Sequence, residues 1–379
     1  MRNATLIRGA RQLLTLRGPS GPRRGADLRN LGIIQDGAVL IANGLIREVG
    51  PSRRLENLAL ARGADEIDAS GRVVMPGFVD CHAHLAGDPE LSPRTIEMLA
   101  LRVLEQAVRH GTTAVEAKSG LGLTEAGELK ILRAYTALRE LPFTLVPTFV
   151  AATAGQDFER LLPVLRRRKL AEFAEIRCEE GGFRPEQICR FLTLAREAGL
   201  GLKVSAGYPS VPNTIAMAVE TRAVTVDGVE ELTEHEAMLL SRSTTIATQL
   251  PGALFQRGIA RSDAARMLID NGAAVALATG YHPCDCPSQN MQMTIALACR
   301  TLQMTAAEAI AASTINAAHA MRREASIGSI ESGKSADLLM LSAPDYRELP
   351  YHFGVNLVDF VMCRGAVLVE RSKVQWPGR

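Results

Sequence analysis

The chain has no marked excess of charge and no long apolar run. Its 379 residues include 43 lysines and arginines against 41 aspartates and glutamates, and the arginine runs near 11–24 and 166–169 are short. Because no basic stripe with interleaved aromatics is present, we expect no nucleic-acid partner. Apolar stretches end well before the roughly 18 residues that a membrane span needs, and no signal-peptide pattern begins the sequence. We therefore expect a cytoplasmic protein that does not bind membranes.

Cysteine is also scarce. The seven cysteines are an odd number without framework spacing, a pattern typical of free thiols in a reducing compartment. Cys81 and Cys178 fit the role of small buried apolar residues better than that of nucleophiles.

Hydrophobic residues, by contrast, make up 47% of the chain. This is enough for one large barrel or for two or three ordinary domains.

Short apolar segments alternate with helix-period segments through the middle of the chain. Helix starts are indicated by Ser92-Pro93 and Thr124, and by Pro185 and Pro212. Strand followed by helix, eight times, favours a parallel (β/α)8 barrel in the α/β class, with a doubly wound sheet as the competing interpretation. The eight expected strands lie near residues 75–79, 113–116, 144–149, 173–177, 201–205, 223–227, 244–248 and 274–279.

The two ends of the chain carry a different pattern. Residues 5–49 and 336–369 alternate apolar and polar positions between turn signals, which indicates short antiparallel strands. Neither end has enough strands to close a core alone. We therefore predict a small β-sandwich from residues 1–72 plus 324–379, beside a barrel domain over residues 73–323.

Two histidines stand at the end of the first expected barrel strand. His82 and His84 stand at i and i+2 in the segment Pro76-Gly77-Phe78-Val79-Asp80-Cys81-His82-Ala83-His84. Alternate side chains of a strand point the same way, so both imidazoles can reach one metal ion. The alternative is packing, in which the two rings are hydrogen-bonded to neighbours under the barrel mouth.

The whole segment from Pro76 to His84 resembles the opening strand of the amidohydrolase superfamily. Further segments narrow the resemblance to imidazolonepropionase, an enzyme that opens a five-membered imidazolone ring in histidine degradation. The matching segments are Gly111-Thr112-Thr113, Glu116-Ala117-Lys118-Ser119-Gly120, Thr148-Phe149, Cys178-Glu179, Leu250-Pro251-Gly252, Gly333-Lys334-Ser335-Ala336-Asp337-Leu338 and Tyr351-His352-Phe353-Gly354-Val355-Asn356. The resemblance covers roughly residues 30 to 370 and implies the barrel fold and a homodimer.

The resemblance also implies a metal centre, with zinc or iron as the candidate ion, but half of its ligands are substituted. The family holds the metal with the His-x-His pair, a histidine after the fifth strand and an aspartate after the eighth. The fifth strand carries Ser205 where the histidine stands, and the eighth is followed by Gly280 where the aspartate stands. Only His82 and His84 of the four ligands are retained.

The positions that the family uses for substrate and proton handling are substituted too. They are Thr153 after the third strand, Gly207 and Tyr208 after the fifth, and Gly228 after the sixth. A metal hydrolase needs an open-coordinated cation and a group that moves a proton. We therefore predict that the original reaction is lost or changed.

Replacement metal ligands could come from the loop after the eighth strand. In a closed barrel this strand lies beside the first, so the loop emerges next to His82 and His84. The candidates offer an imidazole, two thiols and a carboxylate, a set suited to zinc. They are His282, Cys284, Asp285 and Cys286.

Three further residues end barrel strands and are weighed as site residues. Lys118 is a candidate for catalysis, although Glu116 and Lys118 could equally form a buried ion pair that braces the barrel. Glu179 could accept a substrate proton or serve as a structural carboxylate. Cysteine chemistry would require Cys81 or Cys284 to be polarised by a histidine.

Three hypotheses about function follow. The first is a C–N hydrolase of cyclic amides with a remodelled metal site. The second is a non-catalytic homologue that binds a small-molecule ligand or assembles with a partner. The third is a metal-free enzyme that uses Cys81, Cys284 or Glu179.

Overall fold

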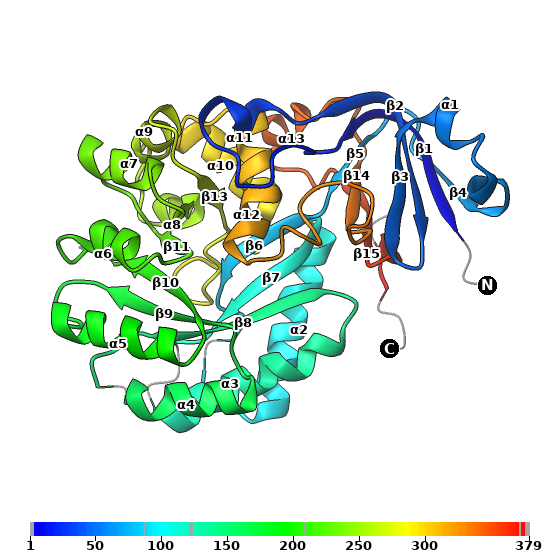
Figure 1. The fold of residues 1–379 in the computed structure, drawn as a ribbon. Helices are drawn as coiled ribbons and strands as arrows, with labels where there is room; N and C mark the ends of the chain where they lie inside the picture. The colour runs from blue at the N-terminus through cyan, green and yellow to red at the C-terminus, as the bar shows by residue number, and fades with distance from the viewer. Residues whose placement is uncertain are drawn as a thin grey trace.

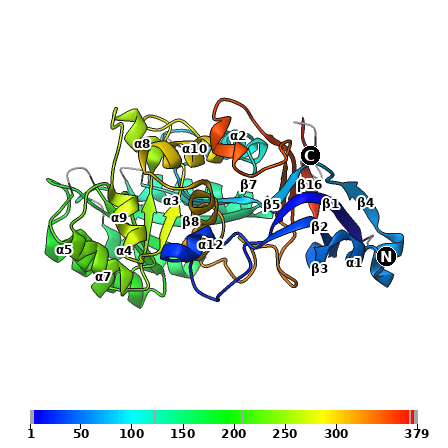
Figure 2. The same cartoon turned by 90° about the horizontal axis from the view of Figure 1, so that it is seen from above.

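The chain folds into a large barrel and a separate mixed sheet, which lie side by side in the ribbon drawing (Figure 1). The computed structural model describes residues 4–86, 88–120, 124–155, 157–207, 210–370 and 373–375. Seen from above, the mixed sheet lies to one side of the barrel (Figure 2). The fold class expected from the sequence is confirmed.

The barrel is built from eight parallel strands that pair in chain order, from β6 to β13. They are β6 (Phe78–Ala83), β7 (Thr112–Lys118), β8 (Thr144–Ala151), β9 (Phe173–Cys178), β10 (Gly201–Ala206), β11 (Thr225–Asp227), β12 (Ile246–Gln249) and β13 (Val275–Leu277). Parallel strands in sequence order need crossover connections, which the intervening helices provide. The doubly wound alternative is therefore excluded.

Helices follow the barrel strands. They are α2 (Pro93–Arg109), α3 (Glu125–Ala137), α4 (Phe158–Arg168), α5 (Pro185–Glu197), α6 (Thr214–Glu220), α7 (Glu234–Ser241), α8 (Pro251–Gln256), α9 (Ala264–Asp270), α10 (Met291–Thr301), α11 (Ala306–Ala312) and α12 (Ile315–Ala320). Ser92 and Thr124 cap α2 and α3 through their side-chain oxygens, as the sequence predicts. Asn213, rather than Pro212, directly precedes α6.

The last barrel strand returns to the first. The backbone N–H of Gly280 donates to the carbonyl of His82 at 3.1 Å, and that of His84 donates to the carbonyl of Tyr281 at 2.7 Å. The loop after β13 therefore emerges beside the two histidines, as expected from barrel closure.

The two chain ends form one nine-stranded mixed sheet. Its N-terminal strands are β1 (Thr5–Leu14), β2 (Ile33–Ala42), β3 (Leu45–Pro51), β4 (Asp65–Asp68) and β5 (Val73–Pro76), with the short helix α1 (Ser52–Leu55). Its C-terminal strands are β14 (Leu338–Leu341), β15 (Val358–Cys363), β16 (Ala366–Glu370) and β17 (Lys373–Val374), with α13 (Glu348–Tyr351). Strand β14 pairs with β5, so both ends contribute to one mixed sheet, where the sequence predicted a small β-sandwich from the same two segments.

The segment expected as the first barrel strand is divided between the two sheets. Val73–Pro76 is β5 of the terminal sheet, and the barrel strand begins only at Phe78. Pro76 has no N–H to continue a ladder. At Gly77 a side chain would overlap that of Thr113, because an added Cβ would lie 2.2 Å from its hydroxyl oxygen. This Pro-Gly pair therefore passes the chain from one sheet to the other.

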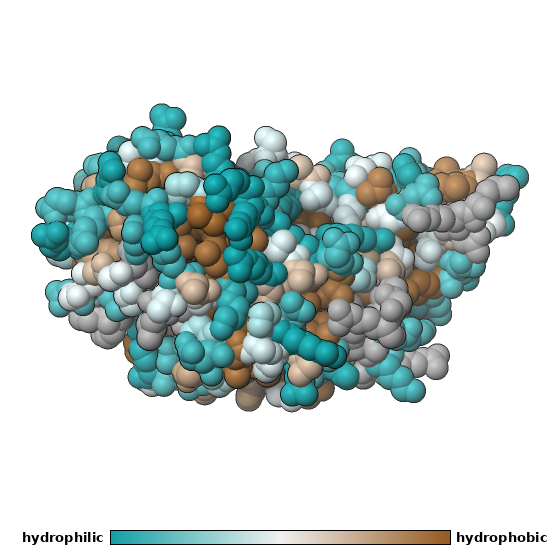
Figure 3. Space-filling model, turned by 90° about the horizontal axis from the view of Figure 1, so that it is seen from below, coloured by the Kyte–Doolittle hydropathy of each residue, from teal (hydrophilic) through white to brown (hydrophobic). Residues whose placement is uncertain are grey.

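The face of the molecule seen from below is mostly hydrophilic and carries smaller apolar areas (Figure 3). Apolar side chains are instead concentrated inside and around the barrel and within the terminal sheet. Among the described helices, none combines the length and the hydropathy that crossing a bilayer would require.

Candidate functional site

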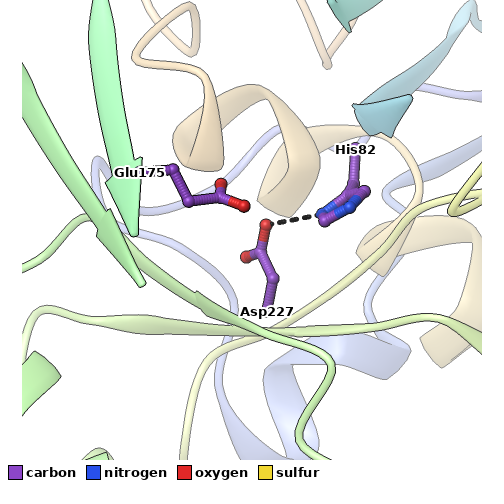
Figure 4. Close-up of side chains that lie close together, drawn as sticks. All are labelled: His82, Glu175 and Asp227. Carbon is purple, nitrogen blue, oxygen red and sulfur yellow. Dashed lines mark hydrogen bonds and ion pairs between the residues drawn. The ribbon is translucent and has the colours of Figure 1, made fainter. Parts of the chain in front are cut away.

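A buried hydrogen-bond network joins four strands, β6, β7, β9 and β11, in the interior of the barrel. One carboxylate oxygen of Asp227, on β11, accepts hydrogen bonds from Lys118 Nζ at 2.8 Å and from His82 Nδ1 at 2.8 Å. Glu175, on β9, forms an ion pair with the same Lys118 ammonium. Glu175 and Asp227 face His82 across the barrel interior (Figure 4). The contacts link strands that are not neighbours, so they must pass through the barrel.

Charge partners outweigh burial in this network. Burial disfavours both charged forms, yet Asp227, Glu116 and Glu175 together hold the pKa of Lys118 well above its ordinary value. Lys118 and His82 likewise hold the pKa of Asp227 well below its ordinary value, against the effect of burial. Lys118 and Asp227 are therefore a stable ion pair, as the bracing interpretation of Lys118 requires.

A second ion pair lies next to the first. Lys203 Nζ donates to a carboxylate oxygen of Glu116 at 2.5 Å, and the Thr148 hydroxyl donates to the other oxygen at 2.7 Å. Lys203 also lies 4.8 Å from the centroid of the Phe173 ring. All four side chains are buried. Two lysines thus serve three interior carboxylates, those of Glu116, Glu175 and Asp227.

Sequence reasoning did not identify Glu175 or Lys203 as site residues. Their signal was present: Lys203 is the one charged residue of β10 and stands two residues before Ser205, and Glu175 stands two residues before Arg177 in β9. Because strand side chains alternate, each of these charges shares one face of its strand with the residue two positions later. The partners could not be deduced, since they come from strands across the barrel.

Asp80 anchors the strand that carries His82. It accepts hydrogen bonds from the Thr279 hydroxyl at 2.5 Å and from the Thr279 N–H at 3.0 Å. The backbone N–H of His82 donates to the same carboxylate at 3.4 Å. These bonds tie β6 to the segment after β13 and fix the position from which the His82 ring enters the site.

We expect Asp80 to make stability depend on pH. Burial raises the pKa of its carboxyl to about 6, although hydrogen bonds from Thr279 act in the opposite direction. The unfolded value is about 3.9, so the folded state binds the additional proton between these values. The stability from that proton is complete below about pH 4 and is lost as pH rises through about 6.

The variant Asp80→Asn tests this dependence. Its free energy of unfolding relative to the parent should rise by about 3 kcal/mol between pH 4 and pH 7, measured by urea unfolding at each pH. Because asparagine can keep hydrogen bonds to Thr279, the difference in free energy of unfolding between variant and parent reports the effect of the Asp80 charge. If the free energies of unfolding of the two proteins changed with pH in parallel, the expectation would be contradicted.

His84 connects the network to the loop after β13. Its ring centroid lies 5.6 Å from that of His82 and 5.4 Å from that of His282. Burial lowers the pKa of His84 well below its ordinary value, and the two neighbouring histidines act in the same direction. Its Nδ1 is buried without a hydrogen-bond partner in the described structure, as is the second carboxylate oxygen of Asp227.

Of the predicted loop ligands, His282 is the residue that the structure brings to the pair. Its Nδ1 accepts the backbone N–H groups of Cys284 and Asp285, so only Nε2 is left to bind anything else. Cys284 is exposed, the Asp285 side chain is 81% exposed, and the buried Cys286 thiol is directed at the Thr279 carbonyl, 3.5 Å away. The loop therefore offers one donor.

The glycines at family positions are closely packed. A Cβ added at Gly207 would lie 2.0 Å from the Cβ of Glu179, and one added at Gly280 would lie 3.4 Å from the Cβ of Leu250. Gly228 and Gly280 have φ of 75° and 63°, in the left-handed region that favours glycine. A side chain at position 207 would therefore overlap Glu179, whereas a Cβ at position 280 would lie at ordinary contact distance from Leu250.

The remaining candidates lie near the same end of the barrel. Ser205 is near the end of β10 and pairs with Arg177 of β9. Thr153 follows β8. Tyr208 lies outside the described residues. Burial raises the pKa of the Cys81 thiol well above its ordinary value, which makes it a poor nucleophile.

One group among the described residues has the spacing of a metal site. His82, Glu175 and Asp227 each offer a donor atom, and these atoms lie within 4.8 Å of one another. The ammonium of Lys118 contacts both carboxylates of this group. The donor set therefore does not fit a divalent ion while Lys118 keeps this position.

Comparison with known proteins places the fold. The amidohydrolase family model matches residues 73–368. The zinc complex of a mutant atrazine chlorohydrolase from Arthrobacter aurescens superposes with a TM-score of 0.78 at 16% identity, covering 98% of this chain and 96% of that one. An adenosine deaminase from Xanthomonas campestris with bound zinc superposes with a TM-score of 0.74 at 19% identity, covering 98% and 94%. At these identities, the superpositions show the fold alone.

Curated relatives are much more similar in sequence. The imidazolonepropionase of Alkaliphilus metalliredigens is 35% identical over 97% of this chain and 99% of its own length. Those of Symbiobacterium thermophilum and Chloroflexus aggregans are 36% and 37% identical, and each alignment covers at least 96% of both chains. With the matching family model and the barrel, this similarity shows that the chain belongs to the amidohydrolase family, as an imidazolonepropionase-like member.

Proposed function

We propose that this protein binds a small molecule at the barrel mouth and does not hydrolyse imidazolone propionate. The observation that carries the proposal is the interior network, in which Lys118 forms ion pairs with both Glu175 and Asp227 beside His82. Hydrolysis of an amide by this family's chemistry requires a metal-activated water and a group that moves the proton. The network leaves no carboxylate pair open for a metal.

The positions around the network supply no substitute. Ser205 contributes a hydroxyl, which is a weak metal ligand, and Gly228 and Gly280 contribute no side chain. His82 is held by Asp227 through Nδ1, so its Nε2 could accept a proton, but a general base alone contributes only about 100- to 10,000-fold in rate. Binding without the original turnover is the activity that these residues support.

A cavity beside two of the substituted positions supports the binding role. It has a volume of about 430 Å³ and lies next to the ends of β10 and β11, where Gly207 and Gly228 contribute to its lining. Glu230, Glu231 and Glu236 are also in its wall. A cavity of this size holds a small molecule, and the carboxylates favour a neutral or cationic ligand.

The decisive assay measures hydrolysis of imidazolone propionate. The reaction is monitored through the loss of the substrate's ultraviolet absorbance. We expect a rate no higher than that of buffer, because water activation and proton transfer are both impaired. The Alkaliphilus metalliredigens relative, assayed in parallel, controls for substrate quality. Turnover by this chain comparable to that of the relative would refute the proposal.

A wider panel of substrates distinguishes a changed reaction from a lost one. A panel of other five- and six-membered cyclic amides should also give no turnover, and thermal-shift screening should find ligands that raise the melting temperature. Hydrolysis of any panel member would instead support an altered amidohydrolase.

Two further expectations belong to this proposal. Similarity to imidazolonepropionases supports a cytoplasmic protein, and the resemblance supports a homodimer. Sedimentation velocity checks the second, since a monomer at micromolar concentration would contradict it.

A further inference from the structure

We infer that the ammonium group of Lys118 takes the place of a divalent ion among His82, Glu175 and Asp227, so that this barrel assembles its interior site without metal. The inference concerns the cation at the site and holds whether or not the protein catalyses a reaction. It is carried by the contacts of Lys118, by the charge balance of the interior, and by the residues above the network.

The contacts of Lys118 are those that a bound cation would make. Its Nζ is 2.8 Å from the Asp227 oxygen that also accepts from His82, and it pairs with Glu175. These three residues are the one group in the described parts of the chain whose donor atoms lie close enough together to share a metal ion. A metal at this place would have to displace the ammonium from both carboxylates.

The charge balance opposes such a displacement. Lys118 and Lys203, both buried, already serve the carboxylates of Glu116, Glu175 and Asp227. Adding a doubly charged ion would place three cations within one low-dielectric interior, where repulsion between like charges is weakly screened.

Among the described residues, the side chains above the network do not form a second group with the spacing of a metal site. His282 lies beside His84 and presents a single free nitrogen. The donor atoms of His82, His84 and His282 do not come within 4.8 Å of one another as a set.

This arrangement makes Lys118→Met a gain-of-binding variant. Methionine has a similar length and no charge, so the change removes the ammonium from between Glu175 and Asp227 and leaves His82 and the two carboxylates available to a metal. One oxygen of Asp227 is already without a partner among the described residues. Lys203→Met is the matched control, because it also removes a buried lysine but leaves Lys118 in place between Glu175 and Asp227.

The experiment compares the parent, Lys118→Met and Lys203→Met after EDTA treatment and dialysis. Each protein is titrated with Zn²⁺ followed by thermal unfolding, and with Co²⁺ followed by visible absorbance. We expect no bound metal and no shift for the parent and for Lys203→Met. Lys118→Met should bind one equivalent and gain about 2–5 °C in melting temperature, and adding His82→Ala should abolish that gain.

Two results would overturn the inference. The first is a parent protein that binds one equivalent of Zn²⁺ in a manner that His82→Ala abolishes. The second is a folded Lys118→Met variant that binds none. If Lys118→Met does not fold, the titration of the parent decides alone. Because the readouts are binding and stability, failure here is distinguishable from failure of the proposed function, which depends on substrate turnover.

Discussion

Replacing Lys203 by methionine is expected to lower the free energy of unfolding by about 3–5 kcal/mol, the range measured when one partner of a buried ion pair is removed. The change leaves the Glu116 carboxylate buried and without its 2.5 Å partner. The hydrogen bond from Thr148 and the more distant Lys118, 3.5 Å away, compensate only in part. Urea unfolding followed by circular dichroism measures the loss.

The double variant Lys203→Met, Glu116→Gln controls this prediction. It removes one positive and one negative charge, so the net charge of the interior is unchanged, and glutamine can still accept from Thr148. We expect it to recover about 2 kcal/mol or more of the loss, because the destabilisation comes from the unpaired carboxylate rather than from the missing lysine. If the loss in the double variant equalled the sum of the losses in the two single variants, Lys203 and Glu116 would not be energetically coupled.

The substitution Gly207→Asp should destabilise the protein by about 3 kcal/mol or more, at or above the upper end of ordinary overpacking. The added Cβ would lie 2.0 Å from the Cβ of Glu179 and 2.7 Å from its Cα. Real Cβ atoms do not approach so closely, so the backbone of the segment after β9 must shift. Thermal and urea unfolding of the variant measure the effect.

Two comparisons show whether this clash is the cause. Gly354→Ala should change stability by less than about 0.5 kcal/mol, because nothing lies within 4 Å of its added Cβ. Combining Gly207→Asp with Glu179→Gly should recover only part of the loss, since the Glu179 Cα is itself in contact range. Full recovery, or a stable Gly207→Asp protein, would refute the packing argument.

The alternation of strand and helix predicted the barrel, and the matched patterns at the two ends predicted a small β-sandwich from both. The structure confirms the barrel and joins the two ends in one mixed sheet. Barrel closure also placed His282 next to His84 correctly, because adjacency of the first and last strands follows from closure alone. The expected first strand, however, is shared between two sheets, since periodicity cannot show at which residue a chain leaves one ladder for another.

The sequence by itself indicated the fold and the His-x-His pair, because these depend on local order along the chain. Only the tertiary structure decided which charges meet. Lys118 lies on β7, Glu175 on β9 and Asp227 on β11, and their side chains converge because a closed barrel directs alternate residues of every strand to one axis. Such convergence depends on strand tilt and register across the barrel, which no single segment encodes. It is therefore the packing of the barrel that places the Lys118 ammonium group between Glu175 and Asp227.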